Sequence, residues 1–494
     1  MAVRLCGSLF ALALLSAGCQ SQPPVARFLT ADIADRVPPP SALQRADVPS
    51  GVQPPAVQTV VPVSHEEPVS HEELEPSTPP ASENAKSDDP IFAGNELSLD
   101  ALVAAVESRN PSLAGMVAAW QAAAQRYPQA VALDDPTLQF MMAPASLGST
   151  EVEPAYAIQA SQKLPWYGKR AARGEAATAE ANAAYFDSED GRLRLREATT
   201  IAFFDYYLVQ RNLELNGQDV PVMRELRETA LTKYRANQVT QQDVLQAELE
   251  LADLDRRRIE LDRMQRVAVA RINTLLRRRP NAVLPAAPRR LTPTETLPPA
   301  EQLEQIALAA RPDLAALRAR VEAEQAAVTL ACKQNYPDVE VFGRYDTFWQ
   351  PSSMADLRGQ IGVSLNLPVY RGKLNAALNE AFFRLNQRKS EYEGRVLDIQ
   401  YEVQSAYERL EESRKTVRLY AERILPAADQ NVAVARANYD VAKTTFLGMA
   451  QSQRQIIELR GKQEEAIAEE HRRLAELERV LAGPLPRSAT PHSD

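Results

Sequence analysis

Apolar and polar residues alternate along four short stretches of the chain. In the clearest of them, Ile361, Val363 and Leu365 alternate with Gly362 and Ser364. A period of two predicts β-strands with one apolar and one polar face. The other three stretches lie around Leu138, Ile158 and Val341. Two half-buried hairpins on a globular domain and the strands of a membrane barrel both fit this pattern.

Long helical patterns follow each pair of strands, from about 169 to 236 and from about 373 to 441. At 1.5 Å per residue, each of these helices spans roughly 100 Å. Return helices are predicted to begin near Gln241 and Phe446. In the first of them an apolar residue recurs every seven positions, at Ala247, Leu254, Leu261, Ala268 and Leu275. This seam predicts a coiled coil, so the long helices pack side by side in a bundle or tube.

An internal repeat underlies these patterns. Residues 109–113 (Arg-Asn-Pro-Ser-Leu) match residues 310–314 (Ala-Arg-Pro-Asp-Leu). Further along, Pro221 matches Pro426, and both are expected to kink their long helices. The offset between the copies grows from 201 to 205, as small loop insertions would produce.

The mature chain is therefore one unit written twice. We place the first repeat at 96–280, a linker at 281–300 and the second repeat at 301–485. Each repeat is predicted to contain a helix, two strands, a long helix, a turn that forms its tip, and a return helix. The predicted fold class is mainly α with a small β part, built from long coiled-coil helical hairpins and four β-strands.

The first residues predict export. A short apolar run precedes Ser-Ala-Gly-Cys19, so 1–18 is interpreted as a signal peptide. The ending resembles a bacterial lipobox, in which Cys19 is acylated, although Ser16 stands where leucine is usual. The alternative is ordinary cleavage beside an incidental cysteine. Gln20 favours the outer membrane, because it is not the aspartate associated with retention in the inner membrane.

Both ends are predicted to lie outside the folded repeats. Residues 20–95 contain 14 of the 35 prolines. Because large apolar residues are few there, 19–95 is predicted to be a disordered, lipid-anchored tether. Residues 486–494 form a short tail.

Composition and motifs exclude several function classes. A net charge of −9 argues against a nucleic-acid partner. No phosphate-binding loop, nucleophile elbow or zinc-protease motif occurs, so we predict no enzyme activity, no cofactor and no metal site. His471 is expected on a solvated helix face.

Four strands cannot close a barrel, since the smallest usual barrel has eight. If these strands span a membrane, several copies must contribute. Eight strands from two copies enclose only side chains, so an open conduit favours three copies.

The chain resembles the TolC-type outer-membrane efflux factors, and most closely the branch that serves heavy-metal exporters. The resemblance rests on the duplication, on the Leu164-Pro-Trp-Tyr-Gly-Lys169 turn, on Asp243–Ala247, and on Ile272–Leu276. It implies a homotrimer with a 12-stranded β-barrel in the outer membrane, continued by a 12-helix α-barrel. It also implies a passive, gated conduit in a tripartite system. The partners would be a periplasmic adaptor and an inner-membrane pump of the resistance-nodulation-division (RND) type, and this pump would supply the energy.

The resemblance also assigns site residues. Adaptor-contacting tips are expected at Asn237, Gln238, Val239 and Thr240 and at Ala442, Lys443, Thr444 and Thr445. A pore constriction is expected at Asp243, Gln246 and Gln451. Asn237 and Ala442 replace the family's usual glycine, and Gly448 occupies the second-repeat position that matches Asp243. The alternative for Asp243 is a charge that stabilises the start of a helix.

A rival function remains open at this point. A periplasmic coiled-coil lipoprotein could act as a scaffold without a pore. The exported substrate, whether metal ion, drug or other small molecule, is not encoded in any motif of this chain.

Overall fold

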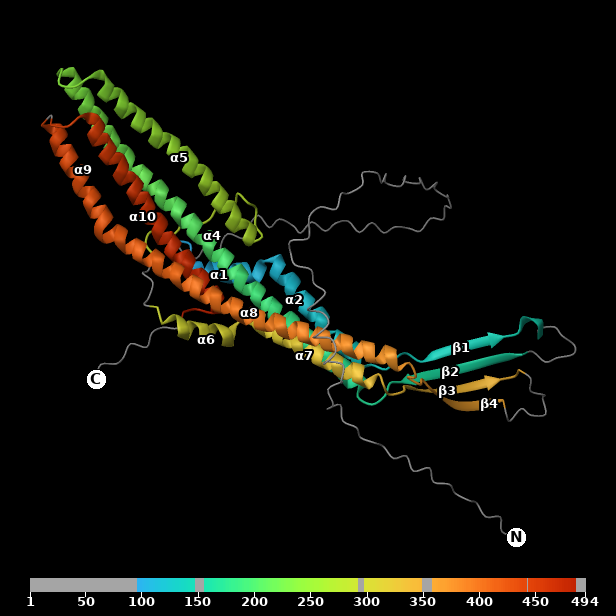
Figure 1. The fold of residues 1–494 in the computed structure, drawn as a ribbon. Helices are drawn as coiled ribbons and strands as arrows, with labels where there is room; N and C mark the ends of the chain where they lie inside the picture. The colour runs from blue at the N-terminus through green and yellow to red at the C-terminus, as the bar shows by residue number, and fades with distance from the viewer. Residues whose placement is uncertain (1–95, 147–154, 292–296, 349–357, 442, 486–494) are drawn as a thin grey trace, which may run out of the picture. The chain divides into compact units, whose positions relative to one another are not determined.

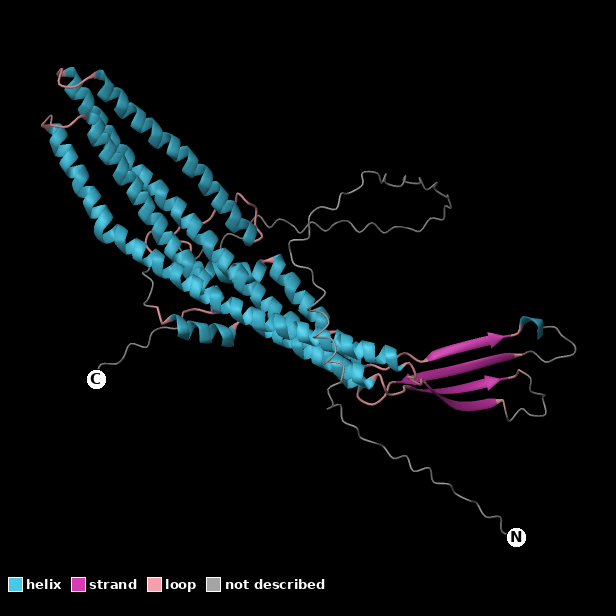
Figure 2. Ribbon diagram, in the orientation of Figure 1, coloured by secondary structure: helices cyan, strands magenta, loops and turns pink. Residues whose placement is uncertain are grey.

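The computed structural model describes residues 96–146, 155–291, 297–348, 358–441 and 443–485. The predicted signal peptide, Cys19, the tether and the tail all lie outside these ranges, and so does Ala442. Within the described part, the predicted architecture of long helices with a small antiparallel sheet is confirmed (Figure 2).

The elements recur in the same order in both halves (Figure 1). The first half contains α1 (Leu99–Arg109), α2 (Pro111–Ala124), α3 (Arg126–Val131), β1 (Thr137–Met142), the 3-10 turn η4 (Pro144–Ser146), β2 (Tyr156–Leu164), α4 (Lys169–Arg235) and α5 (Gln241–Leu275). The second half contains α6 (Ala300–Ala310), α7 (Pro312–Lys333), β3 (Val339–Asp346), β4 (Gly359–Leu365), α8 (Arg371–Leu419), the π-helical segment η6 (Tyr420–Ile424), α9 (Leu425–Asp440) and α10 (Phe446–Val480).

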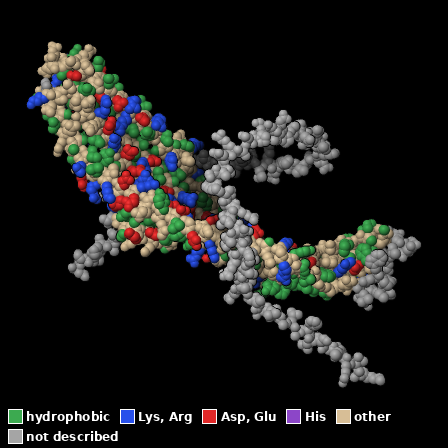
Figure 3. Space-filling model, in the orientation of Figure 1, with side chains coloured by type: hydrophobic (Ala, Val, Ile, Leu, Met, Phe, Trp, Pro, Cys, Tyr) green, Lys and Arg blue, Asp and Glu red, His purple; other side chains and the backbone are tan. Residues whose placement is uncertain are grey.

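The four strands form one antiparallel sheet in the order β1-β2-β3-β4. Its central pairing joins the two halves, with Ala160 opposite Gly343. Because side chains alternate along a strand, residues directly opposite one another share a face. One face is therefore mostly apolar, and its large side chains are exposed, including Leu138, Phe140, Ile361, Val363 and Leu365. Hydrophobic side chains are visible on the sheet end in Figure 3, whereas charged side chains are spread along the helices.

The two long helices differ at their prolines. Helix α4 runs unbroken for 67 residues with Pro221 inside it. The second helix is helical from Arg371 to Asp440, close to the predicted range, but the π-helical segment η6 separates α8 from α9 just before Pro426. Proline has no N–H for the carbonyl four residues earlier, here that of Glu422, and its ring presses on that carbonyl. A π-helical turn is one of the known ways in which a helix accommodates such a defect.

The coiled-coil seam of α5 is buried as predicted. Ala247, Leu254, Leu261 and Ala268 are all less than 10% exposed. Leu275 is only half-buried, because Ile272 and Leu276 fill the core at that end. Among the described residues, three apolar clusters lie along the bundle. The one nearest the helix tips combines residues of both halves, among them Met223, Val244, Tyr439, Phe446 and Met449.

His471 was expected on a solvated face, and this was wrong. Its ring stacks on Phe204, with 4.9 Å between the ring centroids and 19° between the planes. Burial lowers the pKa of His471 below its ordinary value, and this effect outweighs the negative charge of Glu470, which raises that pKa. The helical periodicity of α10 did not reveal this contact, because the partner comes from α4. Among the described residues, none of the helices combines the length and the apolar character needed to cross a membrane.

Candidate functional site at the helix tips

The first tip joins α4 to α5 through a left-handed turn. Asn237 has φ 54°, as its tolerance of this conformation predicted. The N–H of Asn237 donates to the carbonyl of Tyr234 at 2.9 Å, and that of Gln238 donates to Lys233 at 2.9 Å. These bonds satisfy carbonyls that the end of α4 would otherwise leave without partners.

The second tip contains an equivalent hydrogen bond. The N–H of Lys443 donates to the carbonyl of Asn438 at 2.8 Å, 205 positions after the bond from Gln238 to Lys233. Thr445 then caps α10, where its side chain accepts from the N–H of Gly448 at 3.4 Å. Thr240 precedes α5 in the same extended conformation but makes no side-chain cap. Thr444 and Val239 are half-buried, whereas Gln238 is exposed.

Contacts between the two hairpins hold the tips together. The Nζ of Lys233 donates to the carbonyl of Tyr439 at 2.7 Å and lies 4.0 Å from the centroid of its ring. Burial, with the charges of Asp243 and Asp440, raises the pKa of Tyr439 to about 12. The end of the first long helix is therefore fixed against the end of the second.

The three residues predicted to form a constriction have different surroundings. Asp243 is half-exposed in the first turn of α5, and its N–H donates to the carbonyl of Thr240 at 3.2 Å. Gln451 is exposed on α10. Gln246 donates from Nε2 to Oε1 of Glu250 at 2.9 Å, so its amide already has a partner within the chain.

Sequence reasoning missed Glu250 and Arg454. The side chain of Glu250 is only 6% exposed, and Arg454 binds it through both Nε, at 3.1 Å from Oε2, and Nη2, which contacts Oε1. The available signal was an acid between Ala247 and Leu254 on the buried seam. A charge at such a position needs a partner, and here the partner comes from α10 of the other repeat.

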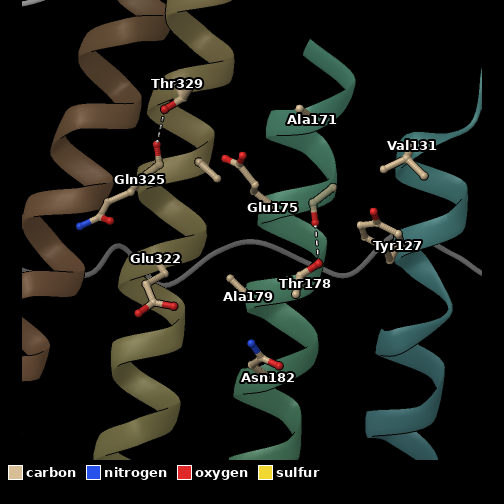
Figure 4. Close-up of a pocket in the computed structure, with 12 residues that line it drawn as sticks. Tyr127, Val131, Ala171, Glu175, Thr178, Ala179, Asn182, Glu322, Gln325 and Thr329 are labelled. Carbon is tan, nitrogen blue, oxygen red and sulfur yellow. Dashed lines mark hydrogen bonds between the residues drawn. The ribbon is translucent and has the colours of Figure 1, made fainter. Parts of the chain in front are cut away.

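A cleft of 710 Å³ lies away from the tips, among α3, α4 and α7. Figure 4 shows Glu175 and Glu322 on facing helices. The hydroxyl of Thr178 donates to the carbonyl of Gly174, and that of Thr329 donates to Gln325, so both are satisfied by their own helices. Among the described residues there is no group of three or more His, Cys, Asp or Glu placed to hold a metal ion.

Comparison with known proteins shows which proteins the chain resembles in sequence and in fold. Residues 303–483 match the family model of outer membrane efflux proteins. The cobalt-zinc-cadmium resistance protein CzcC of Cupriavidus metallidurans is 23% identical over 320 residues, covering 64% of this chain and 74% of CzcC. The chain is therefore similar to outer membrane efflux proteins. This family and its structural neighbours are channel proteins, not enzymes.

Solved structures share the fold of this chain. The outer-membrane channel OprN has a TM-score of 0.67 at 22% identity, covering 78% of this chain and 90% of OprN. CusC has a TM-score of 0.68 at 16% identity, covering 78% of this chain and 92% of CusC. VceC from Vibrio cholerae has a TM-score of 0.65 at 19% identity, covering 78% and 97%.

Proposed function

We propose that three copies of this chain form the outer-membrane channel of a tripartite efflux system. The channel is a passive conduit that takes its cargo from a periplasmic adaptor and an inner-membrane pump of the RND type. The acylated Cys19 adds a lipid anchor. The tips at 237–240 and 442–445 contact the adaptor and open the periplasmic entrance.

The exposed apolar face of the sheet is the observation that supports this proposal most strongly. Leu138, Phe140, Ile361 and Val363 are each more than 60% exposed. A large exposed apolar patch marks a protein or membrane contact. The sheet also ends in two edge strands, β1 and β4. Joining these edges between three copies would give a barrel of twelve strands with its apolar face toward lipid. The six helical hairpins of the three copies would continue this barrel as a tube of twelve helices.

The cargo is proposed to include divalent metal ions. CzcC is described as a cobalt-zinc-cadmium resistance protein, and it is similar over most of its length to this chain. The half-exposed Asp243 would contribute three carboxylates in a trimer, and an acidic ring favours cations.

The test uses the full chain, purified in detergent and reconstituted into planar bilayers. A trimer by native mass measurement, with cation-conducting channels, is the expected result. A chain that stays in solution without detergent once its N-terminal lipid is removed, and gives no channels, would instead indicate the periplasmic scaffold.

A further inference from the structure

A buried ion pair joins the two repeats where the sheet meets the helices. Lys169 opens α4, and its Nζ lies 2.7 Å from Oδ1 of Asp338, just before β3. The two side chains are 6% and 15% exposed. Lys169 also donates to the carbonyl of Tyr336 at 2.9 Å, and the N–H of Trp166 donates to Asp338 at 2.9 Å.

This pair has an electrostatic reason. The start of a helix carries a partial positive charge, so a lysine there is unfavourable unless an anion is close. The first turn of α4 has no acid of its own, and Asp338 provides the anion. Burial alone would raise the pKa of Asp338, but hydrogen bonds from Lys169 and Trp166 outweigh it and lower that pKa.

The strand registers define the equivalent positions in the other repeat. Leu138 pairs with Ala160 in the first hairpin, and Val341 pairs with Val363 in the second. Both strands of the second hairpin therefore lie 203 positions after those of the first. The same shift places Asp135 in the position of Asp338. The matching turns place Lys373 in the position of Lys169, with one inserted residue.

Neither equivalent residue has a charged partner within the described part of the chain. Lys373 and Asp135 are both exposed, and no ion pair joins either of them to another described residue. Helix α8 begins with Arg371 and Lys373 and has no acid in its first turn. Along the chain, Asp135 precedes β1 and Lys373 follows β4, and these two strands form the open edges of the sheet.

We propose that Lys373 forms an ion pair with Asp135 of a second copy of this chain, repeating between copies the contact that Lys169 makes with Asp338 within one copy. This inference rests on the proposed assembly of several copies. It gives that assembly a specific charged contact at each junction between β4 and β1.

The proposal also fixes the register of the joined strands. Within the chain, Gln162 lies opposite Val341 and Ala160 lies opposite Gly343. The same pairing between copies places Leu365 opposite Leu138 and Val363 opposite Phe140. All four of these residues belong to the apolar face, so the face continues across the junction. A register displaced by two residues would instead place Leu365 opposite Phe140 and move Asp135 away from Lys373.

Charge reversal in the full chain tests the pair. Lys373→Glu and Asp135→Lys should each increase the fraction of dissociated trimer in detergent roughly tenfold. The double variant should recover most of the parent's trimer fraction. Lys389→Glu, which reverses an exposed charge on the same helix, is the matched control and should leave the trimer unchanged.

Cysteine cross-linking in a Cys332→Ala background tests the register. Leu365→Cys with Leu138→Cys should form a disulfide between copies, and Leu365→Cys with Phe140→Cys should not. The proposed ion pair is overturned if only Leu365→Cys with Phe140→Cys links copies. It is also overturned if the increase in dissociated trimer in the double charge variant equals the sum of the increases in the two single variants. Either result is compatible with a trimeric parent chain, whereas a parent chain that is monomeric in detergent overturns the proposed function itself.

Discussion

Glu250 on α5 and Arg454 on α10 form a two-point ion pair between the return helices of the two repeats. The Nε of Arg454 lies 3.1 Å from Oε2 of Glu250, and its Nη2 contacts Oε1. The two partners differ in exposure, since the side chain of Glu250 is 6% exposed and that of Arg454 is 55% exposed. This difference determines which partner is costlier to remove.

Arg454→Ala should destabilise the protein more than Glu250→Gln. Removing the arginine leaves a buried carboxylate whose remaining partner among the described residues is the amide of Gln246, at a cost of about 1–3 kcal/mol. Removing the acid leaves an arginine that water can solvate. Thermal unfolding, monitored by the circular dichroism of the helices, measures the loss of stability in both variants. Arg460→Ala, which breaks the exposed pair with Asp429, is the control and should cost less than about 1 kcal/mol. Equal losses for Arg454→Ala and Arg460→Ala would contradict this account.

Gly168→Ala and Gly372→Ala should have opposite effects on stability, although they alter matching turns. Gly168 has φ 81°, and this left-handed conformation alone costs an alanine about 1–2 kcal/mol. In addition, the added Cβ would lie 2.6 Å from Nζ of Lys333, so that side chain would have to move. Gly372 lies in the first turn of α8 with nothing within 4 Å of an added Cβ. Alanine there favours the helix by up to about 1 kcal/mol. Denaturant titration of the parent and the two variants gives the free energy of unfolding of each. A similar decrease of this free energy in both variants would contradict the prediction.

Periodicity and internal repetition predicted the long helices and the strands, because these depend on local pattern. The return helices begin at Gln241 and Phe446, where they were expected. Contacts between the repeats could not be predicted in the same way. Arg454 and Glu250 are 204 positions apart, and the partner of His471 lies on another helix. The strand registers also required coordinates, since matching residues 109–113 with 310–314 gives an offset of 201, whereas the hairpins correspond at an offset of 203.

His471 should make the protein less stable in mild acid. Burial lowers its pKa in the folded state, so the unfolded chain takes up the proton first as the pH falls below about 6.5. Its contribution is fully present above that pH and is lost as the pH falls through the folded-state pKa. His471→Phe keeps an aromatic ring on Phe204 and removes the titration. The drop in melting temperature between pH 7.5 and pH 5 should therefore be smaller in this variant. Burial raises the pKa of Glu197 and of Glu478, so these two groups favour the folded state as the pH falls. Both are present in the parent and in the variant, so their effect on the melting temperature cancels in the comparison.

Asp243→Ala should raise single-channel conductance or reduce cation preference in planar bilayers. The carboxylate is half-exposed in the first turn of α5, beside the turn that joins the first hairpin. Three such charges in one trimer would attract cations and repel one another. In the second repeat the matching position is Gly448, so no second acid replaces the one removed.

Asp255→Ala is the matched control for this experiment, because it removes the same charge from an exposed position of the same helix three turns further on. If Asp243 only stabilises the start of α5, its loss should lower the melting temperature slightly and leave both conductance and selectivity unchanged. A change of selectivity in Asp243→Ala but not in Asp255→Ala would place the carboxylate at the constriction. Equal selectivity in the two variants and the parent would remove Asp243 from the conducting path and leave it the role of a helix-end charge.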